Sequence, residues 1–498
     1  MRITNKMMTN NSLSNINKNK NRLNYLDQQY STGKKIQKPS DDPIVAVRAL
    51  KLRTTVAEID QYYNKNIPDA MSWMEVTESA LKNINSILTN IHTQFNQGAN
   101  DTLSKSDRDS IVKNLQEMKS QIYQEGNTNY AGRYVFTGYK TNTSLIFNEE
   151  SLDTRYSIAE SFSGTAIETV TTVAGSYKIS DYNAGTSTVN DFATAPNVVE
   201  SYRIRLSYDQ LDTTVPTISY KDPVTGDPVA VTPNVVSVTD SDTAYSPAAG
   251  AVNFIPETGE LILGKDVYNA MRLNQTGDIK ITYDKTNFEK GDLRPEHYFT
   301  CTTVDTKAVP PDPGTNYKFE DQKIQYEITF NQKLTINTQG KDAISHSIGR
   351  EIDEVLAAVE DVTITEGKIE EVEKLLKSPH TTEEEKVVLN KLKEQLDTEL
   401  VLKNSILQDK FGAGLTETEK YQEKVSIVIA DAGSRYVRLQ LTESRLDSQL
   451  VDSKELMSNN EDADLAEVII NYTAAETIYN ASLNAASKIV KNTLLDFI

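Results

Sequence analysis

The chain is poor in the residues that disulfides and most structural metal sites require. Its 498 residues include one cysteine, Cys301, and four histidines. A single cysteine excludes an internal disulfide and a cysteine-based zinc site. His92, His297, His346 and His380 lie too far apart in sequence for the ligand spacing of a zinc motif. We therefore interpret all four histidines as structural.

Basic residues are in the minority, and long apolar runs are missing. Lys and Arg number 52 against 71 Asp and Glu, so the formal net charge is -19. Nucleic acids and anionic lipids attract clustered Lys and Arg, so neither is an expected partner. No run approaches the roughly 18 apolar residues of a membrane span, and residues 1–24 lack the apolar core of a signal peptide. Composition alone predicts a cytoplasmic protein without membrane insertion.

Motifs for catalysis are missing as well. The sequence contains no P-loop, His-Glu-x-x-His, Gly-x-Ser-x-Gly or dinucleotide-binding fingerprint. Acidic pairs are too common in this composition to identify a general acid and base. Asp240-Ser241-Asp242 does not continue into the Asp-x-Asx-x-Asx-Gly pattern of a calcium loop. We predict no enzymatic activity, no cofactor and no metal site.

Both ends of the chain carry apolar residues at intervals of seven. Such spacing is typical of a coiled-coil seam. Small residues at Ala475 and Ser482 would let several helices approach closely. The start of the chain is basic and the end is acidic, so opposite charges would orient the two helices. The positions that we expect at an assembly interface are Ile16, Leu23, Tyr30, Leu465, Tyr472, Tyr479 and Ile489.

The first of these segments is rich in asparagine. Each Asn costs a helix roughly 0.5 kcal/mol relative to Ala, so the set opposes helix formation by about 4 kcal/mol. An isolated helix of this length is marginal even in a favourable sequence. We expect both ends to be disordered in the free monomer and helical when packed. The residues concerned are Asn5, Asn10, Asn11, Asn15, Asn17, Asn19, Asn21 and Asn24.

A break and a new helix follow this first segment. Gly33 can end a helix, and Asp42 before Pro43 is a good N-cap with proline at the first helical position. An apolar stripe through Val47 and Leu50 continues toward Gly98, with a kink or interruption expected at Pro68. A second helix near 106–125 would complete a helical hairpin. At the end of the chain, Asp464 and Glu467 are placed as a capping pair.

The segment Gly126–Gly138, together with Ser40-Asp41-Asp42-Pro43 and the start Met1-Arg2-Ile3-Thr4, resembles the flagellin superfamily. The resemblance extends over residues 1–147 and resumes over 425–498, and within the superfamily it is greatest to the hook-filament junction subunits. From the residues alone, Asn127 and Gly132 suit a turn, and Tyr134 and Phe136 alternate as in a strand. The motif and structural positions are Gly33, Lys35, Ile36, Ser40, Asp41, Asp42, Pro43, Asn127, Thr128, Gly132, Tyr134, Phe136, Gly138 and Asp464.

This resemblance implies a structural subunit of the bacterial flagellum. It would join the hook side to the flagellin filament, with another hook-associated protein, flagellin and copies of itself in a ring as partners. It further implies an export chaperone and an extracellular location, reached through the flagellar secretion apparatus without a cleaved signal peptide. The closing residues Leu494–Ile498 favour the junction role. A flagellin filament subunit is the alternative.

The middle of the chain has the two-residue periodicity of strands, as in Tyr202-Ile204-Leu206-Tyr208. We expect a β-rich domain with one solvent-exposed face over 148–341. Its role is an inserted domain or, as a distant alternative, a surface-binding or hydrolytic module. Over 361–420, Glu and Lys at helical spacing predict a second helical hairpin, whose charges would form a solvated face.

The predicted fold is mainly α-helical, with paired N- and C-terminal helices, an inserted all-β domain and the charged hairpin. The sequence predicts a terminal coiled-coil assembly domain over 1–42 and 458–498. A helical rod domain would follow over 43–147 and 342–457. These boundaries rest on the positions of the proline, glycine and acidic breaks between periodic segments.

Overall fold

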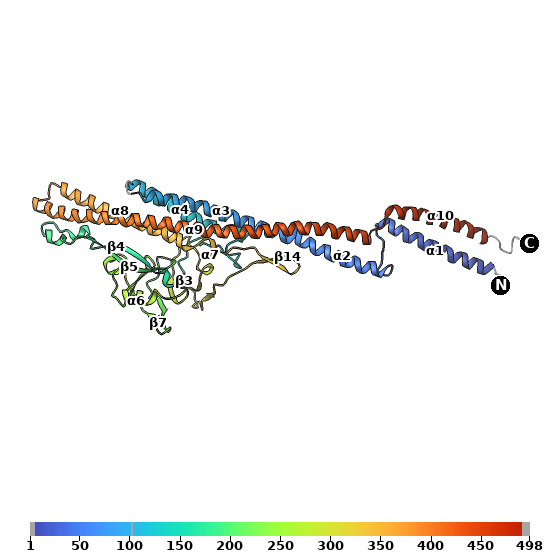
Figure 1. The fold of residues 1–498 in the computed structure, drawn as a ribbon, viewed down its shortest axis with the longest axis horizontal. Coiled ribbons are helices and arrows are strands. Elements are labelled where there is room, and N and C mark those ends of the chain that lie inside the picture. The colour runs from blue at the N-terminus through green and yellow to red at the C-terminus, as the bar shows by residue number, and fades with distance from the viewer. Residues whose placement is uncertain (1–4, 101–102, 491–498) are drawn as a thin grey trace, which may run out of the picture. The chain divides into compact units, whose positions relative to one another are not determined.

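The computed structural model describes residues 5–100 and 103–490 (Figure 1). Long helices at both ends of the chain and strands between them confirm the predicted fold class. The α-helices are α1 (Asn5–Thr32), α2 (Pro43–Gln61), α3 (Ile67–Gly98), α4 (Lys105–Glu125), α5 (Ser241–Ala244), α6 (Lys265–Met271), α7 (Gly340–Ala343), α8 (His346–Lys377), α9 (Glu383–Glu461) and α10 (Leu465–Val490).

The strands form two larger sheets and two small hairpins. They are β1 (Asn129–Tyr130), β2 (Arg133–Tyr134), β3 (Thr154–Phe162), β4 (Glu168–Ala174), β5 (Asn197–Arg205), β6 (Thr217–Lys221), β7 (Pro228–Val231), β8 (Asn234–Val235), β9 (Val252–Ile255), β10 (Glu260–Leu263), β11 (Ile279–Lys285), β12 (Thr300–Asp305), β13 (Thr315–Tyr317), β14 (Gln325–Thr329) and β15 (Gln332–Thr335).

The chain divides into two compact units. The first takes in the chain up to Ala70, the segment Tyr326–Leu334 and the chain from Val437 onward. The second comprises Met71–Gln325 and Thr335–Tyr436. Because α3 and α9 cross the division, each unit is built from segments that are far apart in sequence.

Four long helices form the helical part of the second unit. The ring of Phe95 on α3 meets that of Phe411 on α9 edge to face, with centroids 6.3 Å apart. Helices α4 and α8 are also in contact: the Nζ atom of Lys119 on α4 lies 2.7 Å from the Asp353 carboxylate on α8. The apolar stripe of α3 is buried without gaps, which makes it the core of this part. Its members are Trp73, Met74, Leu81, Ile84, Leu88, Ile91 and Phe95.

The expected interruption at Pro68 takes the form of a π-helical turn, Tyr62–Asn66, between α2 and α3. Pro68 is the second residue of α3, where its missing N–H breaks no hydrogen bond within that helix. A π turn inserts one residue into the ladder of helical hydrogen bonds, so the chain continues as a helix on both sides.

The two larger sheets share one apolar core. The five-stranded sheet has the order β4-β5-β10-β9-β8, and the six-stranded sheet has the order β13-β12-β3-β11-β6-β7. Neighbouring strands are antiparallel except for β8 and β9, which run parallel. Ile158 and Ile281 from one sheet and Ile204 and Phe254 from the other belong to the same buried cluster. The residues 148–341 thus contain a β-sheet domain whose sheets face each other across this core.

The prediction of a solvent-exposed face is wrong for strand β5. Tyr202, Ile204 and Leu206 alternate as expected, and Ile204 is fully buried. The side chains between them, Arg203 and Arg205, are only 5% and 11% exposed. Acidic residues of α8 cover these two arginines. The sequence pattern predicts that this charged face is exposed to solvent, but acidic residues of α8 cover it.

Candidate assembly site

The terminal helices α1 and α10 lie side by side (Figure 1). The rings of Tyr30 and Tyr472 stack with centroids 6.2 Å apart. Near the other end of the pair, the Asn19 side-chain amide donates a hydrogen bond of 2.7 Å to the Ser482 hydroxyl. One of the asparagines that weaken α1 as an isolated helix thus makes a specific contact across the pair. These two contacts fix the register of α1 against α10.

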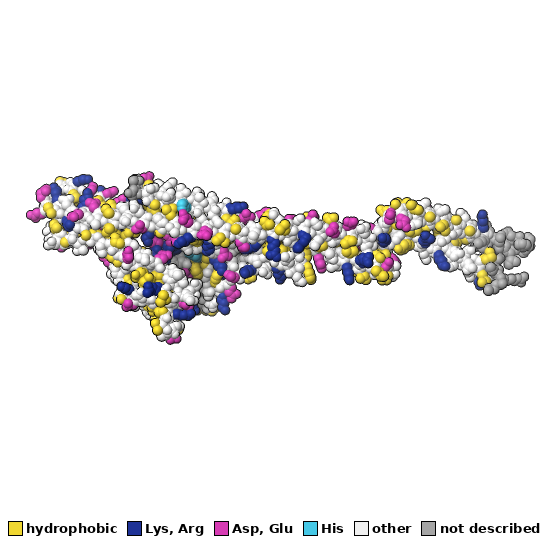
Figure 2. Space-filling view, viewed as in Figure 1, with side chains coloured by type: hydrophobic (Ala, Val, Ile, Leu, Met, Phe, Trp, Pro, Cys, Tyr) yellow, Lys and Arg dark blue, Asp and Glu magenta, His cyan; other side chains and the backbone are white. Residues whose placement is uncertain are grey.

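The pair buries few of its apolar side chains. Leu26, Val468 and Ala475 are less than 8% exposed. Larger apolar side chains remain at least 39% exposed, and hydrophobic side chains are visible along both helices in Figure 2. We refer to this set as the open apolar faces of the terminal pair. It consists of Met7, Met8, Leu13, Tyr25, Tyr30, Leu465, Ile469, Ile470, Ile478 and Leu483.

The seven positions expected at an assembly interface do not share one environment. Tyr30 and Leu465 are 52% and 49% exposed and belong to the open apolar faces. The side chain of Ile489 lies outside the described residues. The other four positions are half-buried, and they are Ile16, Leu23, Tyr472 and Tyr479.

A short backbone pairing joins the two chain segments at the base of the terminal pair. The N–H of Lys35 donates to the carbonyl of Glu461 at 2.7 Å, and the N–H of Ala463 donates to the carbonyl of Gly33 at 2.8 Å. Gly33 has a φ of +68°, which a residue with a Cβ rarely adopts, and this conformation ends α1. The Lys35 carbonyl accepts hydrogen bonds from the Tyr25 hydroxyl and the Gln29 amide of α1.

Ion pairs reinforce the same junction. The Lys34 Nζ atom lies 2.8 Å from Glu461 and 2.5 Å from Asp462, and Arg53 of α2 lies 2.6 Å from Glu461. Hydrogen bonds to Asp462 and Glu461 raise the pKa of Lys34. Those from Lys34 and Ser458 lower the pKa of Asp462. Burial tends to raise the pKa of Glu461, but the hydrogen bonds from Lys34 and Arg53 outweigh it, so that this pKa is also lowered.

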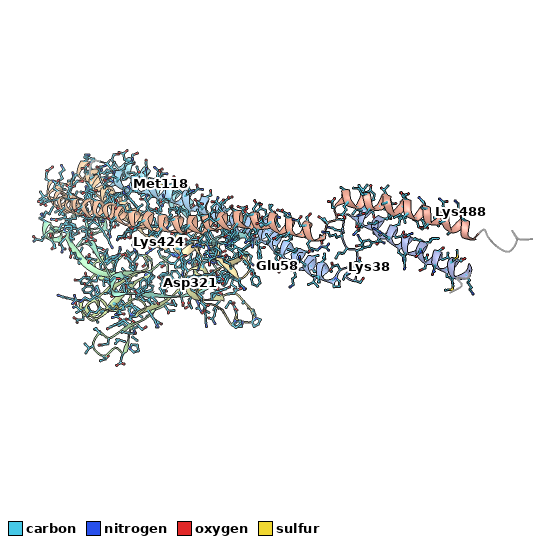
Figure 3. All side chains as sticks on the ribbon, turned by 45° about the vertical axis from the view of Figure 1, so that its right-hand side comes forward. Lys38, Glu58, Met118, Asp321, Lys424 and Lys488 are labelled. Carbon is cyan, nitrogen blue, oxygen red and sulfur yellow. The ribbon has the colours of Figure 1, made fainter. Side chains whose placement is uncertain are left out.

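Carboxylates cap the helices on both sides of the junction. Asp42 Oδ1 accepts from the N–H groups of Ile44 and Val45 at the start of α2, with Pro43 as the first helical residue. Asp464 Oδ1 accepts in the same way from Ala466 and Glu467 at the start of α10. In the loop between α1 and α2, the neighbouring carboxylate orders the turn around Lys38, which is labelled in Figure 3. Asp41 supplies that carboxylate. Ser40 beside it is exposed, and Ile36 is half-buried.

The Gly126–Gly138 motif lies in the second unit, as a small hairpin after α4. Asn127 Oδ1 accepts hydrogen bonds from the N–H groups of Leu145 and Ile146, which ties the end of α4 to the chain beyond the hairpin. Thr128 precedes β1, and its carbonyl accepts from the Val135 N–H. Gly132 and Gly138 have φ values of +79° and +62°.

One detail of the strand prediction in this motif is wrong. Strand β2 ends at Tyr134, and Phe136 lies beyond it in a bend, where it is 1% exposed. The Phe136 carbonyl accepts a hydrogen bond of 2.8 Å from the Gly340 N–H. This hydrogen bond to a segment 200 residues away directs the chain away from the hairpin. No local sequence pattern predicts it.

The apolar stripe predicted for α2 is also placed differently in the structure. Val47 and Leu50 are 55% and 61% exposed, and Ile44 is 75% exposed. The buried face carries Ala46 and Ala49, and of the predicted stripe Ile59 is buried there as well. Small side chains allow the end of α9 to approach closely, and there the Asn460 amide donates to the carbonyl of Val45 at 3.2 Å. Sequence reasoning therefore missed a third open apolar surface in the first unit, made by Ile44, Val47 and Leu50.

Residues 5–100 and 103–490 contain neither a cluster of metal ligands nor a helix that could span a membrane. No group of three His, Cys, Asp or Glu side chains in this part of the chain could hold a metal ion. None of the helices described there combines the length and apolar character that crossing a bilayer requires. His297 lies 3.0 Å from the Ser144 carbonyl, and burial lowers its pKa to about 4. Burial raises the pKa of the Cys301 thiol to about 12, so this buried thiol is not ionised at neutral pH.

Comparisons with known proteins place the N-terminal region. Residues 3–141 match the bacterial flagellin N-terminal helical region. The chain is 34% identical over 145 residues to flagellar hook-associated protein 3 of Salmonella typhimurium, a match that covers 29% of this chain and 45% of the relative. It is 26% identical over 201 residues to flagellin of Clostridium tyrobutyricum, which covers 37% of this chain and 53% of that protein.

The chain therefore spans about half the length of these relatives. The crystal structure of flagellar hook-associated protein 3 from Legionella pneumophila aligns with 82% of this chain and 97% of its own, with 13% identity and a TM-score of 0.29. A TM-score this low does not establish a common fold. The match over residues 3–141 agrees with the resemblance predicted from the motifs: this part of the chain is similar to the N-terminal helical region of bacterial flagellin.

Proposed function

We propose that this protein is a structural subunit of the bacterial flagellum that joins the hook side to the flagellin filament. In this proposal the terminal helices α1 and α10 pack with those of neighbouring subunits, and the predicted positions Ile16, Leu23, Tyr30, Leu465, Tyr472, Tyr479 and Ile489 lie in or beside that packing. The proposed partners are another hook-associated protein, flagellin, copies of the chain in a ring, and an export chaperone.

The observation that carries this proposal is the open apolar faces of the terminal pair. Burying apolar surface stabilises by roughly 25 cal/mol per Å², and large apolar side chains arranged along two helices leave much of that gain unrealised in a single chain. Copies of the same pair could cover these faces, because identical helices present the same apolar spacing at each step. A head-to-tail contact that repeats in this way builds rings or helical filaments.

The match to flagellar hook-associated protein 3 supports the junction role over the filament role. The match to flagellin keeps the filament subunit as the second candidate. The two candidates differ in copy number. A junction subunit is needed in a few copies at one point, whereas flagellin makes up the filament.

Deleting the gene separates the two candidates. If the protein forms the junction, the deletion strain still makes flagellin but sheds it into the medium, because nothing anchors the filament. Loss of the major filament band itself would contradict the junction role and favour the filament role. Complementation with the full chain should restore attached filaments, and complementation with a chain that lacks the terminal helices should not.

The predicted domain division and the export route belong to the same proposal. The terminal assembly domain would comprise 1–42 and 458–498, the rod domain 43–147 and 342–457, and the β-rich outer domain 148–341. Export through the flagellar secretion apparatus would bring the chain to the cell exterior. Finding the protein in the medium of a strain without hooks, and not in that of a strain without the apparatus, would support this route.

A further inference from the structure

The helical hairpin made by α8 and the first part of α9 touches the β domain at two separate places, both within the second unit. The first, which we call the base contact, joins Arg203 and Arg205 of β5 to Glu351 and Glu354 of α8 and to Lys410 of α9. Beside these pairs, Arg350 of α8 pairs with Asp209, and the His346 ring packs against that of Tyr208. The second, which we call the tip contact, joins the loop 175–196 to the end of the hairpin. Over 361–420 the sequence predicted a helical hairpin whose charges form a solvated face.

The base contact is ionic and largely buried. Arg203 Nη2 lies 2.7 Å from Glu354 Oε2, and Arg205 Nη1 lies 2.8 Å from the same oxygen. Arg205 also pairs with Glu351, and Lys410 pairs with the other oxygen of Glu354. Burial tends to raise the pKa of Glu354, but Arg203, Lys410 and Arg205 outweigh it and hold that pKa well below its ordinary value.

Arg203 also anchors the base contact within the β domain. It lies 2.6 Å from Glu260 of β10 and 2.9 Å from Glu168 of β4. The Tyr245 hydroxyl donates to the second oxygen of Glu260 at 2.7 Å. The network therefore runs without interruption from the three strands β4, β5 and β10, with Tyr245 beside them, to two helices of the hairpin. Breaking one partner of such a buried pair leaves an uncompensated charge, so the contact depends on all of its members.

The tip contact is apolar. Phe192 is 1% exposed and packs with buried residues of both helices. Its ring also meets that of Tyr177 edge to face, with centroids 5.3 Å apart. Figure 1 shows this segment between β4 and β5 close to the turn that joins α8 to α9. The helical residues that bury Phe192 are Val372, Val388, Leu389, Leu392 and Leu396.

The loop 175–196 has a defined structure of its own. Two short 3₁₀ helices, Ile179–Asp181 and Val189–Phe192, are each closed by an aspartate that accepts from the backbone N–H three residues earlier, at 2.7 Å. The Tyr177 hydroxyl donates to the Thr194 carbonyl at 2.8 Å and so joins the two ends of the loop. A loop preorganised in this way loses little conformational entropy when it docks.

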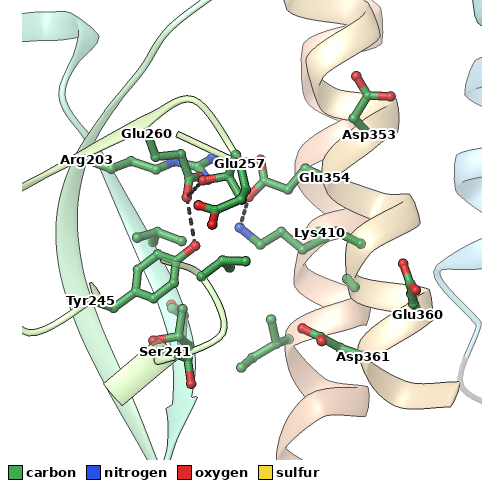
Figure 4. A pocket seen from close by; sticks show the side chains of 18 of the residues that line it. Arg203, Ser241, Tyr245, Glu257, Glu260, Asp353, Glu354, Glu360, Asp361 and Lys410 are labelled. Carbon is green, nitrogen blue, oxygen red and sulfur yellow. Dashed lines mark hydrogen bonds and ion pairs between the residues drawn. The ribbon is translucent and has the colours of Figure 1, made fainter. Parts of the chain in front are cut away.

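Between the two contacts the hairpin and the β domain are separated by a half-open cavity of about 520 Å³ (Figure 4). Arg203, Glu260 and Lys410 lie at one part of its wall, and Asp361 lies further along the helices. The β domain is therefore not packed along the whole hairpin. Its attachment is concentrated at the base and at the tip.

We propose that this hairpin is a strut that holds the β domain in one fixed orientation on the helices of the second unit. Glu354 and Val372, which mark the base and the tip on α8, are 18 residues apart, and thus about 27 Å at the 1.5 Å rise of an α-helix. One contact would let the domain pivot, whereas two contacts this far apart prevent rotation about either one. Opposite charges fix the position at the base, and apolar burial closes the tip.

This role does not depend on the assembly of the terminal helices, because every residue involved lies in the second unit. It assigns a function to the charged hairpin and to the loop 175–196 together, because apolar residues of both form one buried cluster at the tip. The predicted solvated face holds for Glu383 and Glu394, but Glu399 is fully buried between Lys368 of α8 and Lys403 of α9.

The proposal can be tested in the full chain by measuring a distance between two spin labels. Val224, in the turn between β6 and β7, is 92% exposed, and Val401 on α9 is 69% exposed. Both are replaced by cysteine and labelled, while Cys301, which is 2% exposed, stays unlabelled. We expect one narrow distance distribution in this labelled parent.

The two contacts are then broken separately and together. Phe192→Asp opens the tip, and Arg205→Glu opens the base by placing a carboxylate opposite Glu351. We expect each change to broaden the distribution and the combination to broaden it most. Val189→Asp is the matched control for the tip, because Val189 lies in the same short helix and is 39% exposed. The charge exchange Arg205→Glu with Glu351→Arg should restore a narrow distribution.

Hydrogen exchange on the same samples shows whether the β domain stays folded, since the amides of β11 should keep their protection in every variant. If Phe192→Asp removes that protection, Phe192→Ala takes its place with the same expected broadening. A broad distribution in the labelled parent would overturn the proposal. So would a distribution that stays narrow when both contacts are broken and β11 remains protected.

Discussion

The helices α3 and α10 both carry regular apolar residues, but they use them differently. In α3 the stripe from Trp73 to Phe95 is buried within its own chain. Among the apolar side chains described in α10, up to residue 488, Val468 and Ala475 are buried, while Leu465, Ile469, Ile470, Ile478 and Leu483 stay at least 42% exposed. Apolar periodicity therefore does not tell whether a stripe is covered by the same molecule. In this protein α3 contributes its apolar residues to a core within the chain, whereas α10 leaves most of its apolar side chains exposed.

The largest expected difference concerns removal of the terminal helices. A chain without residues 1–40 and 460–498 should remain a folded, soluble monomer, because the α3 core and the β-sheet core lie outside the removed segments. It should not assemble with full-length protein. Circular dichroism during heating and sedimentation of the assembled fraction measure the two effects. Loss of the cooperative thermal transition would show that the terminal pair is part of the monomer core, contrary to this comparison.

A pair of equivalent substitutions makes the comparison quantitative. Leu88 on α3 is fully buried, so Leu88→Ala should lower the free energy of unfolding by about 2–5 kcal/mol. Leu13 on α1 is 52% exposed, and Leu13→Ala should change it by no more than about 0.5 kcal/mol. Denaturant unfolding of the monomer measures both values. Leu13→Ala should nonetheless weaken assembly, and equal destabilisation by the two changes would remove the distinction.

A smaller effect is expected from the cap of α10. Asp464→Ala removes the acceptor for the N–H groups of Ala466 and Glu467, which typically costs about 1 kcal/mol of helix stability. Faster hydrogen exchange in the first turn of α10, with no change in α3, would report this loss. Asp464→Asn keeps a capping oxygen and is the control. If the alanine and asparagine variants exchange alike, the cap does not hold this helix.

The smallest effect is the pH dependence of the junction between Lys34, Glu461 and Asp462. The pKa values of both carboxylates are lowered, so their contribution is complete above about pH 5 and is lost as the pH falls through the lowered values. The pKa of Lys34 is raised above its ordinary 10.5, so its contribution is complete below pH 10.5 and is lost at higher pH.

We expect the junction to contribute at most about 1 kcal/mol between these limits, because Lys34 is 37% exposed and solvent screens the pair. The difference in unfolding free energy between the parent and Lys34→Met, followed from pH 7 to pH 3, measures it. That difference should shrink in acid. A difference that grows as the pH falls would mean that another group near Lys34 dominates.

Much of the architecture could be predicted from the sequence because the signals are local. Seven-residue spacing located both terminal helices, and Asp42-Pro43 located the start of α2. Alternation identified β5, and the Gly126–Gly138 motif predicted the similarity to flagellin that residues 3–141 show. Each of these features can be recognised within about twenty consecutive residues, so no knowledge of distant contacts is needed.

What could not be predicted depends on contacts between distant residues. Strand β3 pairs with β11, some 120 residues further along, and no local pattern specifies that register. Arg203 and Arg205 alternate with apolar residues, a pattern that predicts an exposed face. In the structure, acidic residues of α8 cover both arginines. On α2, Ala46 and Ala49 rather than Val47 and Leu50 face inward, because close approach of α9 favours small side chains.

Hydrogen exchange of the free monomer tests the central claim most directly. The account predicts that amides of α1 and α10 exchange rapidly, while those of α3 between Trp73 and Phe95 exchange orders of magnitude more slowly, at rates close to those set by global unfolding. In the assembled state the terminal amides should become protected. Protection of α1 and α10 in the monomer equal to that of α3 would contradict the claim that these helices depend on neighbouring subunits.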